Sequence, residues 1–173
     1  NNVQGSSDMG AIPFAFTDYR RVDDPAVRAE YAAAWGIAVE RLDRLGAPCF
    51  KIASFEVGDL ELVACAARTN KPLIMSTGMA SDAEVAEAVE VARTNGNGGV
   101  AILHCVSGYP TPIEQTNLKR LDALTRFADI VGISDHSPGA LVPIAAVARG
   151  ACLIEKHLTL KRSDGGPDAG FSL

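Results

Sequence analysis

Short apolar runs alternate with helical patterns along the chain from residue 49 onward. Five runs begin at positions 49, 72, 100, 130 and 151, and they read CFKIAS, PLIMS, VAILHC, IVGIS and ACLIEK. Because their apolar character is continuous rather than alternating, they predict strands that are buried on both faces, as in parallel sheets. Helical spacing fills the intervals at residues 59–68, 81–96, 117–127 and 140–150. Strands joined by helices in this way predict right-handed βαβ crossovers.

The helix expected at residues 81–96 carries its own start and stop signals. Ser81 and Glu84 have the spacing of a capping box, and Gly96 is expected at the C′ position beyond the last turn. The glycine-rich residues 95–99 follow this helix and precede a strand. A phosphate-binding loop needs the reverse order, so this segment is interpreted as a turn.

Five strand-and-helix units fit two α/β architectures, a doubly wound sheet or part of an eight-stranded TIM (β/α)8 barrel. Residues 1–45 differ from the rest. Residues 24–46 predict one long helix, and residues 11–16 could form one short strand. We therefore divide the chain into a helical N-terminal segment, 1–45, and an α/β domain, 46–173.

Composition narrows the class of protein further. The chain is 47% apolar and 21% charged, with a net charge of −5 and a pI near 5.2, which argues against nucleic acid or an anionic membrane as the main partner. The sequence has no apolar run of the roughly 18 residues that a membrane span needs and no signal-peptide pattern. Four cysteines without CxxC spacing are interpreted as reduced packing residues, and a cytoplasmic location is expected.

Candidate chemistry gathers where the predicted strands end, which is where parallel α/β folds bind their ligands. From the first strand to the fifth, these ends carry Lys51, Ser54 and Glu56; Ser76 and Thr77; His104, Ser107 and Tyr109; Ser134, Asp135 and His136; and Glu155, Lys156 and His157. Any one of these has an ordinary structural explanation, such as a turn, a cap or a hydrogen-bonded histidine. Together they place hydroxyls, an amine and imidazoles on one rim.

The residue types at this rim suit an anion-binding metal enzyme. Serines and a lysine bind phosphate or carboxylate, and two histidines from neighbouring strands suit a divalent metal with open positions. A carboxylate among them can transfer protons.

Six segments then make the pattern specific. In this order and spacing, FKIASFE, KPLIMSTGM, LHCVSGYPTP, GISDHSPG, IEKHLTL and RSDGGPDAGFSL resemble the sialic acid synthase family, with its pseudaminic acid synthase branch the most similar. Enzymes of this family condense phosphoenolpyruvate with an N-acetylated amino sugar to make nine-carbon nonulosonic acids. The resemblance covers residues 37–173.

The resemblance implies a fold and an assembly. The family has a TIM barrel followed by a small antifreeze-protein-like domain, and it works as a domain-swapped homodimer. By this resemblance the chain carries strands four to eight of the barrel. The first 36 residues do not resemble the family's third strand. Turnover is therefore expected to require the first three strands and the small domain, which this chain is not expected to supply.

The resemblance also assigns roles to individual residues. It implies that His136 and His157 bind a divalent ion, Mn²⁺ or Mg²⁺, which activates the sugar aldehyde. It implies that Glu56 handles protons and that Tyr109 and Asp168 lie near the sugar. The positions that match phosphoenolpyruvate-binding residues are Lys51, Ser54, Ser76, Ser107 and Ser134. His104 matches no ligand and is expected to be structural.

Other functions remain open at this point. The product could be N-acetylneuraminate or legionaminate instead of pseudaminic acid. The chain could also be an inactive fragment, or a module that only binds an anion or a sugar.

Overall fold

The computed structural model describes residues 24–173, which form five strands, five α-helices and two short 3₁₀ helices. The strands are β1 (Phe50–Ile52), β2 (Leu73–Ser76), β3 (Val100–Cys105), β4 (Ile130–Asp135) and β5 (Leu153–Lys156). The helices are α1 (Pro25–Arg44), α2 (Leu60–Ala67), α3 (Asp82–Asn95), η2 (Ile113–Gln115), α4 (Arg120–Leu124), α5 (Leu141–Ala148) and η3 (Arg162–Asp164). All five strands expected from the apolar runs are present.

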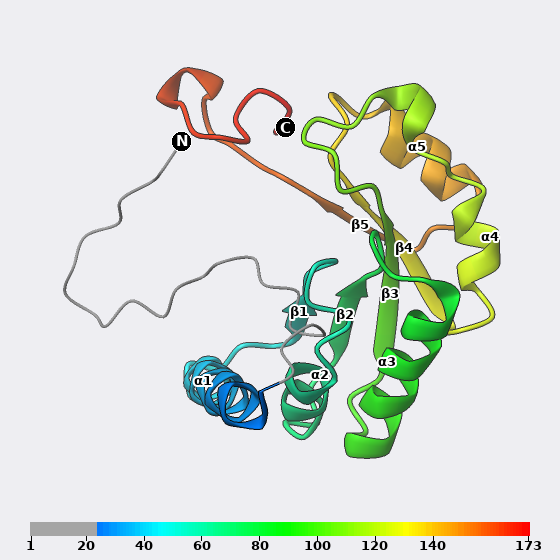
Figure 1. Ribbon diagram of the computed structural model, residues 1–173. Helices are drawn as coiled ribbons and strands as arrows, with labels where there is room; N and C mark the ends of the chain where they lie inside the picture. The colour runs from blue at the N-terminus through cyan, green and yellow to red at the C-terminus, as the bar shows by residue number, and fades with distance from the viewer. Residues whose placement is uncertain (1–23) are drawn as a thin grey trace.

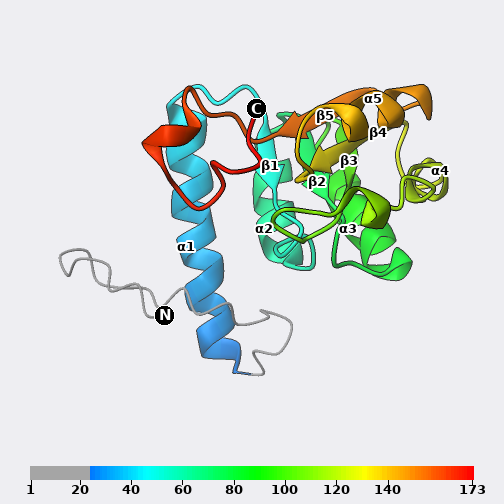
Figure 2. The same cartoon turned by 90° about the horizontal axis from the view of Figure 1, so that it is seen from above.

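The strands form one parallel sheet in the order β1-β2-β3-β4-β5, so each strand pairs with its neighbour in sequence. The sheet is curved, and helices α2, α3, α4 and α5 follow its outer side (Figures 1 and 2). A doubly wound sheet would carry helices on both faces. The one-sided covering therefore decides for the incomplete barrel, whose inner face holds alternate residues of every strand.

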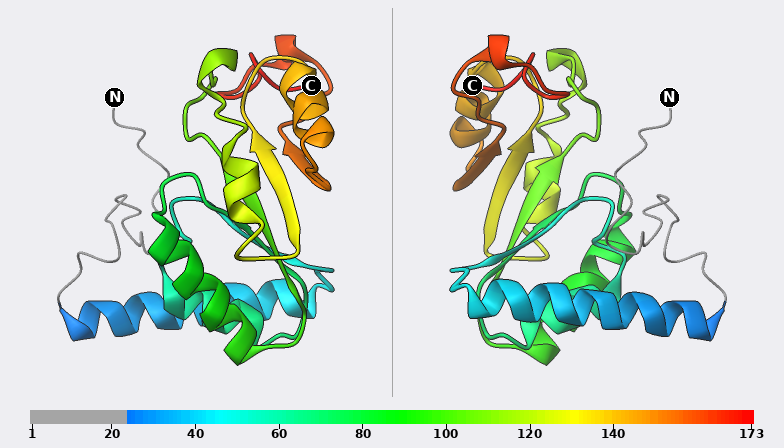
Figure 3. Two further views of the ribbon diagram at one scale, coloured as in Figure 1. Left: turned by 90° about the vertical axis from the view of Figure 1, so that its right-hand side faces the viewer. Right: turned by 90° about the vertical axis from the view of Figure 1, so that its left-hand side faces the viewer.

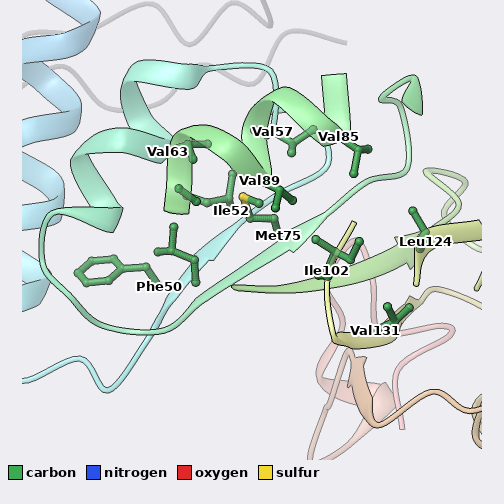
Figure 4. Close-up of a cluster of buried hydrophobic side chains, with 14 of the residues drawn as sticks. Phe50, Ile52, Val57, Val63, Met75, Val85, Val89, Ile102, Leu124 and Val131 are labelled. Atoms are coloured by element: carbon green, nitrogen blue, oxygen red, sulfur yellow. The ribbon is translucent and has the colours of Figure 1, made fainter. Parts of the chain in front are cut away.

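A hydrophobic core lies between the outer face of the sheet and its helices (Figure 4). Residues of β1, β2 and β3 such as Ile52, Met75 and Ile102 meet Val63 of α2 and Val89 of α3, and all five are buried. Because side chains alternate between the faces of a strand, the outward positions are apolar while the inward neighbours can be polar. Lys51 precedes Ile52 in β1 and Ser76 follows Met75 in β2, so this alternation places both side chains on the inner face.

Helix α3 begins and ends where the sequence predicts, but the glycine at its end has a different role from the expected one. The capping box is present, with the Ser81 hydroxyl accepting from the Glu84 N–H and the Glu84 carboxylate accepting from the Ser81 N–H. The helix ends where expected, since Asn95 is its last residue, but Gly96 is its C-cap rather than C′ and has extended backbone with φ −165°. Glycine is required here by space, since a Cβ at residue 96 would lie 1.9 Å from the carbonyl oxygen of Ala67.

The expected N-terminal helix is α1, which begins after Asp24, whose carboxylate accepts a hydrogen bond from the Ala26 N–H at 2.8 Å. Its Trp35 indole N–H donates to Asp59, the N-cap of α2, at 2.6 Å. Figure 3 shows α1 at the end of the sheet opposite to the segment that follows β5. The short strand expected at residues 11–16 lies outside the described residues.

Two expectations for the C-terminal half need correction. The helix predicted at 117–127 is only one turn and a half, α4, flanked by turns. Cys152 is exposed rather than packed, and its thiol donates to the Val131 carbonyl. The four cysteines are all free, and within residues 24–173 no helix is both long and apolar enough to span a bilayer.

Candidate functional site

Lys51 connects three strands at the inner face of the sheet. Its ammonium group donates to the Ser76 hydroxyl of β2 at 2.9 Å and lies 3.3 Å from the Glu155 carboxylate of β5. The register pairs Ser134 with Glu155, and the Ser134 hydroxyl donates to that carboxylate at 2.7 Å. The curvature of the sheet thus brings β1 and β5 into contact through side chains, although both are terminal strands.

Two further serines expected at this site lie together. The Ser54 and Ser107 hydroxyls are 3.1 Å apart, and they come from the loops after β1 and β3. The buried thiol of Cys105 lies among them. Burial raises the pKa of the Cys105 thiol, against the opposing effects of the Ser54, Ser107 and Ser134 hydroxyls and the Lys51 charge. Cys105 is therefore a neutral part of the wall of this cluster.

Glu155 is the residue that sequence reasoning placed at a strand end but gave no role. Its carboxylate holds both Lys51 and Ser134, two of the residues expected to bind phosphoenolpyruvate. A partial signal was present in the sequence, since alternation along β5 puts the Glu155 carboxylate on the inner face, where a charged group needs a partner. The identity of that partner, Lys51, depends on the curvature of the sheet.

His136 lies in the loop immediately after β4 and is buried. Its ring Nδ1 lies 3.0 Å from the Val106 carbonyl oxygen, and this contact leaves Nε2 for another partner. Burial lowers the pKa of His136, opposed by the Val106 carbonyl, and the neighbouring His157 lowers it further. A neutral imidazole with one nitrogen tied to a carbonyl is the form that binds metals in proteins.

His157 lies directly after β5, and its ring centroid is 5.4 Å from that of His136. Its Nδ1 is 3.5 Å from the Asp168 carboxylate, so the second imidazole also has an oxygen beside one nitrogen. Tyr109 stacks on His136 at 4.1 Å between ring centroids, and the buried Phe171 packs 5.2 Å from His157. The structure therefore brings His136, His157, Tyr109 and Asp168 into one cluster.

The segment after β5 is held over this cluster by backbone hydrogen bonds. The Leu173 N–H donates to the His157 carbonyl at 2.9 Å, and the Thr159 N–H donates to the Leu173 carbonyl at 3.0 Å. The Arg162 guanidinium donates to the Ser172 carbonyl at 2.9 Å. These contacts explain how Asp168 and Phe171, which belong to no strand, reach the two histidines.

Glu56 lies half-buried in the turn after β1. Its carboxylate accepts a hydrogen bond from the Ala53 N–H at 3.0 Å, which closes that turn. Glu56 follows Ser54 by two residues in the chain, and its role in proton transfer stays a prediction.

His104 pairs in register with the buried Ile133 of β4, so its side chain lies on the outer face of the sheet, whereas the other two histidines lie on the inner side. It is buried, and its Nε2 lies 2.7 Å from the Thr116 carbonyl oxygen. Burial lowers the pKa of His104, and the positive charge of Arg120 lowers it further, against the opposing effect of the hydrogen bond to the Thr116 carbonyl. These contacts give it a structural role.

The two inward histidines could hold a divalent ion between them. Within residues 24–173, no group of three or more His, Cys, Asp or Glu side chains is placed to bind one ion. Two imidazoles would leave the remaining positions of an ion to water or to oxygen atoms of a substrate, which is the donor set that Mn²⁺ and Mg²⁺ accept. The residues present fit such an ion as an open, two-histidine site.

Two of the hollows among residues 24–173 lie at opposite ends of the strands. A hollow of about 440 Å³ lies between the loops after β2 and β3, and its wall includes Cys105 and Ser107. Another, of about 360 Å³, is lined by the 96–99 loop at the opposite ends of the strands, far from the histidines.

Comparison with known proteins shows which family has this arrangement. The chain is 44% identical over 137 residues to pseudaminic acid synthase of Helicobacter pylori, covering 79% of this chain and 40% of that protein. It is 43% identical over 139 residues to N,N'-diacetyllegionaminic acid synthase of Campylobacter jejuni, covering 79% and 42%. The chain thus spans about two fifths of the length of these relatives.

A solved structure agrees with the sequence relatives. N-acetylneuraminic acid synthetase from Leptospira borgpetersenii, in complex with citrate, superposes with a TM-score of 0.72 at 36% identity, covering 76% of this chain and 46% of that one. The model of the NeuB family matches residues 32–173, which include every strand described above. The chain belongs to the NeuB family of nonulosonic acid synthases.

Proposed function

We propose that the protein forms part of an enzyme that condenses phosphoenolpyruvate with an N-acetylated amino sugar and releases phosphate, as a pseudaminic acid synthase does. The observation that carries the proposal is the meeting of two clusters on one rim. Lys51 and the four serines around it form the cluster that we propose to bind an anion. The ring centroids of His136 and His157 lie 5.4 Å apart beside it. A reaction between a phosphorylated acid and an aldehyde needs both.

The anion-binding cluster supports the choice of phosphoenolpyruvate. The Lys51 ammonium supplies one positive charge, and the hydroxyls that we propose to hold the phosphate or carboxylate are those of Ser54, Ser76, Ser107 and Ser134. Charge-assisted hydrogen bonds of this kind are the strong ones, and several hydroxyls can follow the tetrahedral shape of a phosphate.

We propose His136 and His157 as ligands of Mn²⁺ or Mg²⁺. When bound, the ion supplies Lewis acidity toward the aldehyde oxygen of the open-chain sugar. The chain contributes orientation to this site, because the Val106 carbonyl and the Asp168 carboxylate each face one Nδ1. Tyr109 and Asp168 border the same space and are proposed to contact the sugar.

The proposed reaction balances without a redox partner. The methylene carbon of phosphoenolpyruvate bonds to the aldehyde carbon, and the enol carbon becomes an oxocarbenium centre. Water adds at that centre, and one of its protons ends on the former aldehyde oxygen, which becomes a hydroxyl. The C–O bond to the phosphate then breaks as the new carbonyl forms, and inorganic phosphate leaves with the second proton. Glu56 is the carboxylate proposed to handle protons in these steps.

The branch of the family is a separate part of the proposal. Identity is 44% to pseudaminic acid synthase, 43% to a legionaminic acid synthase and 38% to N-acetylneuraminate-9-phosphate synthase of Drosophila melanogaster. The segments ASFE and GGPDAGFSL favour the pseudaminic branch. A legionaminate synthase is the second candidate, because its identity is nearly equal.

We also propose a homodimer in the complete enzyme and a cytoplasmic location. The location is supported by the four free cysteines, which are typical of reducing compartments.

A graft tests the proposed function directly. Residues 32–173 of this chain would replace the matching segment of Helicobacter pylori pseudaminic acid synthase, so that the relative supplies the remainder of the barrel. The graft would be incubated with phosphoenolpyruvate, Mn²⁺ and a panel of N-acetylated amino sugars, with phosphate release and product mass as readouts. Turnover at an ordinary enzymic rate, about 1 per second, is expected with one of the sugars.

One control variant and one alternative outcome make the result decisive. The same graft carrying His157→Ala should bind phosphoenolpyruvate but release no phosphate. A well-folded graft that binds an anion or a sugar without turnover would overturn the synthase and favour a binding fragment. The sugar that gives product identifies the branch.

A further inference from the structure

We propose that the buried ion pair between Asp135 and Lys156 is a positioning device that holds His136 and His157 together as one divalent-cation site. This inference rests on the metal site proposed above. It concerns two residues that face away from that site, toward the outer side of the sheet, and that have no role in it so far.

The position of the pair in the strands is the first observation. Asp135 and Lys156 are the last residues of β4 and β5, and they are register partners. Each is followed by one of the two histidines. Because successive side chains alternate between faces, the pair points outward while the residues on either side of it point inward.

Contacts show that the pair also fixes the backbone around His136. The Lys156 ammonium lies 2.7 Å from one Asp135 carboxylate oxygen and donates to the Ser137 carbonyl. The other Asp135 oxygen accepts from the Ser137 N–H at 3.0 Å. The residues immediately before and after His136 are therefore both tied to the lysine that precedes His157.

The sheet ladder cannot provide this alignment. Register pairing between β4 and β5 stops at Asp135 and Lys156, so His136 and His157 lie one residue beyond the last paired position. A slip of one residue in either strand would turn a histidine to the other face. Beyond the last paired residues, the ion pair between Asp135 and Lys156 keeps the two chain segments aligned, as backbone hydrogen bonds do within the sheet.

Burial indicates that the pair is there for more than stability. The side chains are 5% and 1% exposed, for Lys156 and Asp135 respectively. Removing two charges from water costs several kcal/mol per ion, and apolar residues of similar volume are often as stable or more stable at such positions. A pair kept at this place is thus explained best by the geometry that it imposes.

The test compares three variants by their affinity for Mn²⁺, measured from the EPR signal of the free ion in titrations of the 173-residue protein. Asp135→Leu with Lys156→Met removes the polar contacts and should weaken Mn²⁺ binding about 10- to 100-fold, while the melting temperature stays at or above that of the wild type. Asp135→Asn with Lys156→Gln keeps hydrogen-bonding groups without charge and should retain most of the affinity. Lys71→Met is the matched control, because Lys71 pairs with Asp43 at the other end of the sheet, and it should not change Mn²⁺ binding.

The outcomes separate this inference from the function on which it rests. His136→Ala must abolish the binding, and if it does not, the metal site and this inference both fail. If His136→Ala abolishes binding but the Leu/Met variant binds Mn²⁺ as the wild type does, the metal site stands and the positioning role is wrong. If the Leu/Met variant does not fold, the Asn/Gln variant decides. A folded Asn/Gln protein that binds Mn²⁺ tenfold more weakly than the wild type would contradict positioning by hydrogen bonds.

Discussion

The half of the sheet formed by β1, β2 and β3 and the half formed by β4 and β5 position their side chains by different means. In the first half, α2 and α3 bury the outer face, and the apolar core fixes the strands that present Lys51 and Ser76. In the second half, β4 and α5 also contribute buried residues to the core, but α5 leaves Leu141, Ile144 and Val147 exposed. There the histidines depend on a buried ion pair and on the segment after β5. Packing against the core therefore positions Lys51 and Ser76, whereas the histidine cluster depends in addition on polar contacts.

The largest expected effect lies in the packed half. Ile102 is fully buried in the core, so Ile102→Ala should lower the free energy of unfolding by about 2–5 kcal/mol through lost burial and a cavity. Urea denaturation followed by circular dichroism measures this difference. A loss below about 1 kcal/mol would show that the first half is not the stable part of the molecule.

The next effect concerns affinity rather than folding. Lys51→Met removes the charge beside the serine cluster, and it should weaken binding of phosphoenolpyruvate by about 1.5–3 kcal/mol, because a charge-assisted contact is lost. Calorimetry on the grafted enzyme is the measurement, with Lys71→Met as the control that removes a lysine outside the site. Equal affinity in the Lys51 variant would contradict the proposed phosphoenolpyruvate site.

A smaller effect on stability should follow from a change of pH, through a histidine of the packed half. Burial lowers the pKa of His104, so the folded state prefers the neutral ring. The stability that this preference contributes is complete above the ordinary histidine pKa of about 6.5 and is lost as the pH falls through the lower folded value. His104→Gln should therefore flatten the fall in melting temperature between about pH 7 and pH 5. An unchanged slope would assign the acid sensitivity to other groups.

The smallest expected effect lies on α5. Ile144 is 67% exposed, and Ile144→Ala should change the free energy of unfolding by less than about 0.5 kcal/mol. It is the matched partner of Ile102→Ala, since both remove the same atoms from the same residue type. A large loss in the Ile144 variant would show that another chain or a second copy covers this face in solution.

Much of the architecture could be predicted from the sequence because the responsible signals are local. Continuous apolar runs specify the five strands, and the spacing of Ser81 and Glu84 specifies the start of α3. The reason for glycine at the end of α3 could not be predicted in the same way. Gly96 is needed because the Ala67 carbonyl of another helix approaches it, and that neighbour is distant in sequence.

The features of the candidate site also separate into those that the sequence predicts and those that depend on the tertiary structure. The sequence by itself determined which residues stand at the strand ends, and with them the family, because strand periodicity and motif order are properties of the chain alone. Only the tertiary structure decided that Lys51 meets Glu155, that Asp168 lies beside His157, and that His104 faces outward while His136 faces inward. These relations depend on the curvature of the sheet and on the path of the segment after β5. Both result from packing among residues far apart in the chain, which no local pattern encodes.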